Sequence, residues 1–240
     1  MRRIVRGAAL VTVCSTTIGG CGADRPPRDQ PAARLTAAVL SQQDMPSDFL
    51  PAEDQQVFGQ VKPADPDCRR LLALADLRGL RDVPNAVSTA PPQVHAVFYR
   101  TDPGSTLAEH LLVLSPARAL SHIKHTERAA TRCPRIKVGH GKGRMRLHRV
   151  PMQLPGFEKN AYGVRYTGRI GPRYSIHFDL VMAQQDDRLL VVEQPALIDR
   201  WHHTQGDYTC RIAETALRKL RKVTSLPSAE PLGHPAATTP

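Results

Sequence analysis

Residues 174–182 read Tyr-Ser-Ile-His-Phe-Asp-Leu-Val-Met, and this stretch decides the class of fold. Apolar residues alternate with polar ones along most of it, which is the period of a strand with one buried face and one wet face. The Gly-Pro pair at 171–172 marks a turn before the stretch, and residues 184–187 mark another after it. We therefore predict an antiparallel meander in which 161–168 and 188–194 are the neighbouring strands.

The rest of the central chain supplies more strands and a set of helices. Further strands are predicted at 94–100, 107–114 and 145–150. Apolar residues at helical spacing predict helices that begin near residue 66, span 116–131 and follow residue 207. Thr106 with Glu109 also matches a capping box, which would make 106–114 helical. Ser115 and Pro116 form the better helix start, so we favour the strand.

These elements predict an α+β fold with an antiparallel sheet of about five to six strands and two to three helices packed on it. The segments on either side of the domain are rich in proline and polar residues and have little to bury. We expect a signal peptide at 1–20, a disordered tether at 21–34, a single domain at 35–223 and a disordered tail at 224–240.

The N-terminus is basic, then apolar, and ends in Ile18-Gly19-Gly20-Cys21. Its apolar part is far shorter than the roughly 20 residues that span a bilayer, and the two glycines before Cys21 suit a signal-peptide cleavage site. The stretch resembles the lipobox of bacterial lipoproteins. That resemblance implies that Cys21 becomes the mature N-terminus, carries acyl chains such as palmitate, and anchors the protein at the extracytoplasmic face of the cell membrane.

The chain is basic, with 33 Lys and Arg, 22 Asp and Glu, and a formal charge of +11. Removal of residues 1–20 takes three of the 33 basic residues and no acidic one, which leaves 30 against 22 and a charge of +8. Outside the cytoplasm such a charge meets anionic lipids and wall polymers, so we expect no nucleic-acid partner.

The cysteines indicate one disulfide. Cys14 leaves with the signal peptide and Cys21 carries the lipid, so Cys68, Cys133 and Cys210 remain and allow three pairings. We favour Cys68 with Cys133, because one begins a predicted helix and the other ends a second one. Cys210 would then remain a buried thiol.

The order of parts resembles the extracytoplasmic sensor-type domain of actinobacterial lipoproteins and of mycobacterial serine/threonine kinase H. The resemblance covers roughly residues 35–223 and rests on four groups of residues. They are Leu40 with Met45-Pro46-Ser47-Asp48-Phe49, Asp65-Pro66-Asp67-Cys68 with Leu71-Leu72, Cys133-Pro134, and Ala216-Leu217-Arg218-Lys219-Leu220. It implies a sheet with helices on one side, a cleft that binds a ligand, and no established reaction. The chain departs from the family in having three mature cysteines and no kinase domain.

Few residues suggest catalysis or metal binding. Ser121 and Lys124 match the Ser-x-x-Lys pair of penicillin-interacting enzymes, but the other elements of that site are missing from the sequence. His122 with His125, and the pair at 202–203, lack the spacing of a metal site. We therefore interpret these residues as a solvated helix face and exposed loop positions, and we expect no cofactor.

A glycine-rich basic segment lies between two predicted strands, at 139–144. It lacks the Gly-Lys-Ser/Thr ending of a phosphate-binding loop that precedes a helix. We predict a basic hairpin loop able to contact an anionic headgroup or polymer. Its candidate binding residues are Lys137, His140, Lys142, Arg144 and Arg146.

From these features we expect a membrane-anchored extracytoplasmic module that binds a small ligand or an envelope protein, as a sensor domain does, without catalysis. Two alternatives stay open: an envelope-directed hydrolase, and a structural protein that associates with anionic membrane or wall polymers. A cluster of ionisable groups with perturbed pKa values in a cleft would favour the hydrolase.

Overall fold

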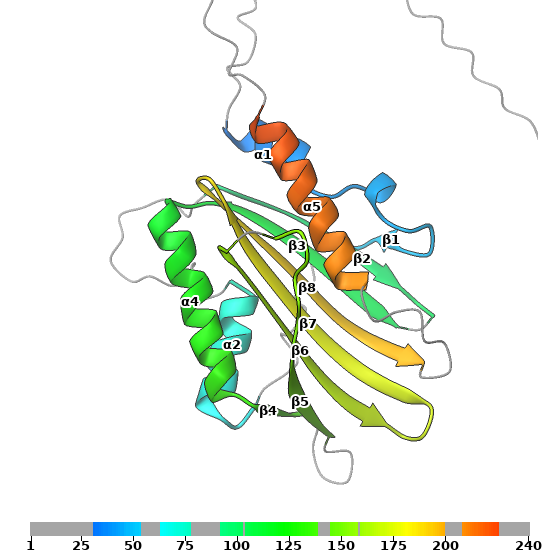
Figure 1. The fold of residues 1–240 in the computed structure, drawn as a ribbon. Helices are drawn as coiled ribbons and strands as arrows, with labels where there is room; N and C mark the ends of the chain where they lie inside the picture. Colours follow the sequence, from blue (N-terminus) through cyan, green and yellow to red (C-terminus); the bar gives the residue numbers. More distant parts are fainter. Residues whose placement is uncertain are drawn as a thin grey trace, which may run out of the picture.

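The computed structural model describes residues 31–53, 63–77, 92–102, 104–138, 145–157, 159–199 and 208–225. Within these ranges the chain forms one antiparallel sheet with helices on both of its faces (Figure 1). The elements in chain order are α1 (Pro31–Ala38), a 3-10 turn η1 (Gln42–Asp44), β1 (Leu50–Pro51), α2 (Pro66–Ala75), β2 (Gln93–Arg100), β3 (Ser105–Val113), α4 (Pro116–Arg132), β4 (Arg135–Val138), β5 (Met145–Pro151), β6 (Ala161–Ile170), β7 (Tyr174–Gln185), β8 (Arg188–Asp199) and α5 (Tyr208–Thr224).

The strand order is β1-β2-β3-β8-β7-β6-β5-β4, and every neighbouring pair is antiparallel. The predicted meander is confirmed, since β5 to β8 follow one another in space as they do in sequence. The predicted hairpin of β2 and β3 is also confirmed, and it joins the meander through β8. β3 is a strand and α4 begins at Pro116, as the Ser-Pro pair indicates.

The sheet is larger than predicted, because it has eight strands in the described residues where five to six were expected. The two additional strands are β1, with two residues, and β4, with four. Segments this short do not hold enough residues for a period-two pattern to stand out. Four α-helices are described rather than two to three, and α1 was not predicted. It includes residues 31–34, which were expected to belong to the tether.

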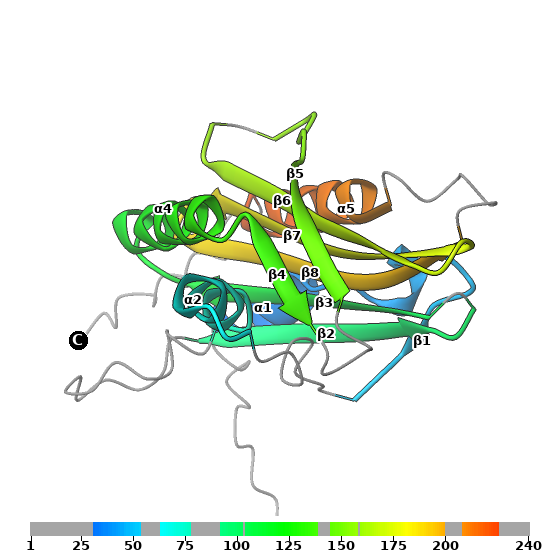
Figure 2. The same ribbon diagram turned by 90° about the horizontal axis from the view of Figure 1, so that it is seen from below.

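The helices lie on both faces of the sheet, whereas the family resemblance implies one. Helices α2 and α4 pack on one face, through a core that includes Leu180 and Met182 of β7. Helices α1 and α5 pack on the other face, through a core that includes Val181. Figures 1 and 2 both show α2 beside α4, away from α5. In the described parts of the chain, no helix combines the length and the apolar character that crossing a membrane requires.

The alternation of β7 predicted that its polar face is exposed to solvent, but the structure buries Asp179 and Ser175 on this face. Asp179 is 3% exposed beneath α5. Two hydrogen bonds of 2.7 Å join its carboxylate to the guanidinium of Arg165 on β6, and the Thr209 hydroxyl at the start of α5 lies 2.6 Å from it. The Thr209 hydroxyl also lies 2.7 Å from Gln194 on β8. Since β6, β7 and β8 each contribute to this network, α5 is fixed across three strands.

Gly168 lies where the backbone of β6 comes close to β5. A β-carbon at this position would stand 2.7 Å from the Arg146 carbonyl oxygen and 2.7 Å from Leu147 Cδ2. We expect Gly168→Ala to lower the free energy of unfolding by about 2 kcal/mol, because the strand backbone would have to move. Chemical denaturation measures this, with Gly104→Ala as the control because nothing lies within 4 Å of its β-carbon position. Equal losses in both variants would contradict the steric explanation.

Candidate functional site

A pocket of about 710 Å³ opens at the end of the sheet where β2 turns into β3. We call it the sheet-end pocket. It is lined by residues 51–53, 99–101, 104–106, Ile176 and 195–197. Its volume lies in the range of small-molecule sites, and such sites combine apolar surface with a few polar groups.

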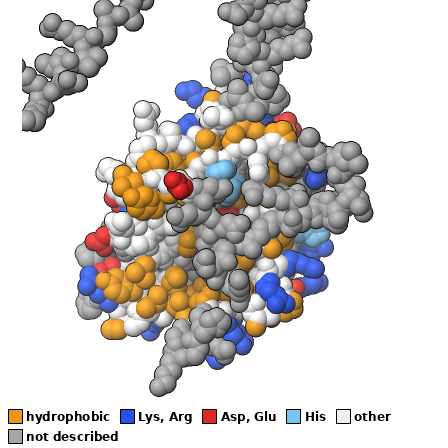
Figure 3. Space-filling view, turned by 180° about the vertical axis from the view of Figure 1, so that it is seen from behind, with side chains coloured by type: hydrophobic (Ala, Val, Ile, Leu, Met, Phe, Trp, Pro, Cys, Tyr) orange, Lys and Arg blue, Asp and Glu red, His pale blue; other side chains and the backbone are white. Residues whose placement is uncertain are grey.

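The floor of the sheet-end pocket is apolar. Tyr99, Ile176 and Leu197 lie on three different strands, and the strand register places all three on the face that α2 and α4 cover farther along the sheet. Tyr99 is 38% exposed, and Gln93 and His95 on the same face of β2 are exposed as well. On the side of the molecule seen in Figure 3, hydrophobic side chains are exposed in several groups.

Polar groups lie along the same face, between the pocket and the helices. Glu193 is wholly buried on β8, two residues from Pro195 at the pocket floor. His95 and His110 face one another across β2 and β3, with ring centroids 5.9 Å apart. No group of three or more His, Cys, Asp or Glu in the described residues could hold a metal ion.

The hydroxyl of Ser105 at the pocket makes contacts with the neighbouring strand β8. Ser105 Oγ accepts a hydrogen bond of 2.9 Å from the Gln194 amide and lies 3.4 Å from the Pro195 carbonyl oxygen, so it holds β3 to β8. The charged residues among the described lining are Glu53 and Arg100. The arrangement can hold a ligand by shape and apolar contact.

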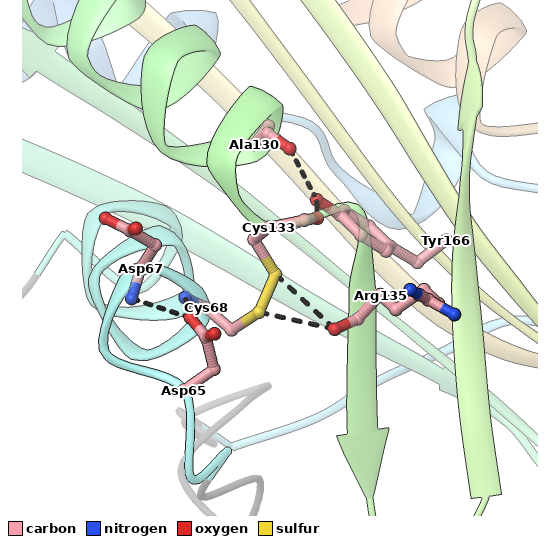
Figure 4. The surroundings of a disulfide bond; sticks show 7 residues. All are labelled: Asp65, Asp67, Cys68, Ala130, Cys133, Arg135 and Tyr166. Atoms are coloured by element: carbon pink, nitrogen blue, oxygen red, sulfur yellow. Dashed lines mark hydrogen bonds between the residues drawn. A yellow bond between two sulfur atoms is a disulfide. The ribbon is translucent and has the colours of Figure 1, made fainter.

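The predicted disulfide between Cys68 and Cys133 is present, and it joins the start of α2 to the end of α4 (Figure 4). The Asp65 side chain caps α2 by accepting hydrogen bonds from the amides of residues 67 and 68. The hydroxyl of Tyr166, buried on β6, donates to the Cys133 carbonyl oxygen at 2.7 Å. Cys210 is buried outside any disulfide, and its thiol lies 3.6 Å from the Gln153 carbonyl oxygen.

The predicted anion-binding residues are described only in part. Lys137 and Arg146 are exposed and lie directly opposite one another on β4 and β5. Three other candidates and the predicted lipid acceptor lie outside the described residues. These are His140, Lys142, Arg144 and Cys21.

The Ser-x-x-Lys pair and the two histidines of the same helix make contacts within α4 and with α2. Ser121 and Lys124 are exposed on α4, and the serine hydroxyl lies 3.3 Å from His125 Nδ1. His122 was expected on the solvated face of the helix, but it is buried, and its Nε2 lies 3.2 Å from the Leu74 carbonyl oxygen of α2. Burial lowers the pKa of His122, because the charged imidazole is disfavoured there. His122 therefore joins two helices, while the pair at 202–203 lies outside the described residues.

Comparison with known proteins supports the fold. No family model and no curated protein matches the sequence. The structure is similar to the extracellular domain of PknH from Mycobacterium tuberculosis, with a TM-score of 0.57 at 12% identity over 80% of this chain and 96% of that one. The chain therefore has the fold of this extracellular domain.

Two other solved structures match more weakly. An uncharacterized protein of Mycobacterium smegmatis gives a TM-score of 0.40 at 11% identity, over 79% of this chain and 96% of that one. LpqN of M. tuberculosis, described as involved in cell envelope biogenesis, gives 0.27 at 10% identity, over 71% and 77%. Both TM-scores are too low to indicate a shared fold.

The sequence did not reveal the sheet-end pocket. Ile176 and Leu197 belong to alternating strands, and an apolar strand residue has the same pattern whether a helix covers it or not. The polar turn residues at 101–104 were the one available signal, since they mark the end of the sheet where no helix follows directly.

Proposed function

We propose that the protein is a lipid-anchored extracytoplasmic module that binds a small ligand in the sheet-end pocket, without catalysing a reaction on it. The observation that carries this proposal is the pocket itself, about 710 Å³ with an apolar floor on the sheet. Support comes from the fold, which is that of the extracellular domain of a protein named PknH. The N-terminal resemblance to a lipobox supports anchoring through Cys21.

The chemistry of the pocket favours an amphipathic ligand. An apolar body would lie on Tyr99, Ile176 and Leu197, and the Thr106 hydroxyl at the rim would meet a polar group. Removal of apolar surface from water on both partners would drive the association.

Native mass spectrometry of the full-length protein, extracted from its own membranes in mild detergent, tests this proposal. We expect a discrete added mass after exposure to an organic extract of the cell envelope. Leu197→Trp should weaken retention of that mass by about tenfold or more, because the larger ring fills the pocket floor. The intact mass also shows whether Cys21 carries acyl chains.

The matched control is Val150→Trp, which places the same ring at a 40% exposed apolar position on β5. It should retain the added mass as the wild type does. If both variants bind alike, or if the wild type gains no mass, the sheet-end pocket does not bind a component of the extract. Unchanged thermal unfolding of Leu197→Trp shows that a lost mass reflects the pocket and not the fold.

A further inference from the structure

A second hollow lies over strands β5 to β7, and its lining is more basic than that of the sheet-end pocket. It measures about 530 Å³ and is lined by Arg146, His148, residues 167–169 and Ser175. None of these residues is acidic, and each of the polar side chains can donate a hydrogen bond. The hollow is therefore suited to an anion.

The strand register extends the positive charge beyond the hollow. Lys137 on β4 is paired with Arg146 on β5, and Arg146 shares the hollow with Arg169 on β6. One cation thus comes from each of three neighbouring strands. Beside this row, Arg135 is paired with His148. We call these five side chains the basic face.

The basic face is not explained by the needs of the fold. Like charges placed directly opposite one another in a sheet destabilise it. A lysine on the edge strand β4 protects against aggregation, but Arg146 and Arg169 lie farther inside the sheet. No carboxylate of the described residues pairs with Lys137, Arg146 or Arg169, although Arg165 on the same face pairs with Asp179 at 2.7 Å. An anion from outside the chain would relieve this repulsion.

We propose that the basic face binds a linear phosphate-bearing polymer of the cell envelope. Neighbouring strands are about 4.8 Å apart, so a chain lying across β4, β5 and β6 meets a new cation at each strand. Arginine and lysine donate charge-assisted hydrogen bonds to phosphate oxygens, and arginine does so through two donors at once. This proposal retains Lys137 and Arg146 of the predicted loop and adds Arg169, which sequence analysis did not single out.

A polymer fits this surface better than a bilayer does. The site is a hollow, and a flat layer of headgroups would not enter it. Figure 1 also places β4 and β5 at the end of the molecule opposite α1, which is the described element nearest in sequence to Cys21. The lipid anchor proposed at Cys21 would therefore join the domain at its α1 end.

The test measures binding of the full chain carrying Cys21→Ser to medium-chain inorganic polyphosphate by isothermal titration calorimetry. The double variant Arg146→Gln/Arg169→Gln should bind roughly tenfold more weakly or worse, through loss of two charge-assisted contacts. It should also show a shallower dependence of affinity on salt. The matched control is Arg118→Gln/Arg128→Gln, which removes two exposed charges from α4 and should bind as the wild type does.

Equal weakening in both double variants would show that net charge drives binding and would overturn the proposal. Orthophosphate competing as well as polyphosphate at the same phosphate concentration would overturn a polymer ligand. Binding to vesicles of equimolar phosphatidylglycerol and phosphatidylcholine, without binding to polyphosphate, would assign the face to the membrane instead. If the double variant unfolds at a lower temperature, Lys137→Gln provides a milder test at the exposed edge. None of these results depends on the ligand of the sheet-end pocket.

Discussion

Replacing Cys68 and Cys133 together with alanine is expected to lower the free energy of unfolding by about 4 kcal/mol. The disulfide joins residues 65 positions apart, and a loop of that length in the unfolded chain loses much of its entropy when it is closed. For a domain of this size the loss corresponds to a fall in Tm of about 8–16 °C. Denaturant and thermal unfolding of both proteins measure it.

The folded state contributes a local reason for this loss. Cys68 and Cys133 are both within the buried core formed by α2, α4 and the sheet. Helix α2 has only ten residues, and an isolated helix of that length is unstable in water. Without the disulfide, α2 depends on its apolar contacts and on the bond between His122 and the Leu74 carbonyl oxygen.

Two controls separate the disulfide from the general effect of losing a cysteine. Cys210→Ala removes a buried thiol and should cost about 1 kcal/mol or less. A reducing agent should destabilise the wild type and leave the double variant unchanged. A double variant as stable as the wild type, or one that still responds to the reducing agent, would show that the bridge does not support the fold.

The sequence predicted those features of the fold that depend on local patterns. Alternation predicted β7, and the Ser-Pro pair predicted the start of α4 at Pro116. The Cys68 pairing was predictable because both residues stand at helix ends, where side chains from two elements can meet. Each of these inferences starts from a local pattern, which for the disulfide is the position of each cysteine at the end of its own helix.

The features that depend on tertiary contacts were not predictable in the same way. Asp179 has the pattern of a solvent-facing strand residue, and only the packing of α5 shows that it is buried with Arg165. The sheet-end pocket exists because no described helix covers that end of the sheet. Arg169 belongs to the basic face because the register of β5 with β6 brings it beside Arg146, and the pattern of either strand alone does not determine that register.

Glu109→Gln is expected to change how stability depends on pH. Glu109 is wholly buried on β3, and its Oε2 accepts a hydrogen bond of 2.5 Å from the Leu40 amide. Burial raises the pKa of this carboxyl group from 4.5 to about 8, because the charged form is disfavoured in the core. The Leu40 hydrogen bond and the charge of Lys219 lower the pKa, and the charge of Asp44 raises it, but burial dominates.

The sign of the effect follows from proton binding. Between pH 4.5 and pH 8 the folded protein keeps the proton on Glu109 while the unfolded chain loses it. The contribution of Glu109 to stability is therefore full below pH 4.5, falls as pH rises, and reaches its minimum above pH 8. At about 1.4 kcal/mol per pH unit, the loss between pH 4.5 and pH 7 is about 3 kcal/mol.

Glutamine resembles the protonated acid and does not titrate, so Glu109→Gln should not lose stability in this way. The quantity to measure is the difference in unfolding free energy between variant and wild type at each pH. Burial lowers the pKa values of His122 and His177, which makes stability rise with pH through their own range. Because both proteins contain these histidines, the difference isolates Glu109.

We expect this difference to favour the variant increasingly from pH 4.5 to pH 8 and then to level off. Glu127→Gln is the control, since Glu127 is exposed on α4 and its loss should leave the wild-type profile unchanged. Parallel profiles for Glu109→Gln and the wild type would mean that Glu109 is ionised in the fold throughout. If the prediction holds, ionisation of Glu109 weakens the packing of the segment around Leu40. Hydrogen exchange of the Leu40 amide should then lose more protection between pH 7 and pH 9 than the amides of β7 do.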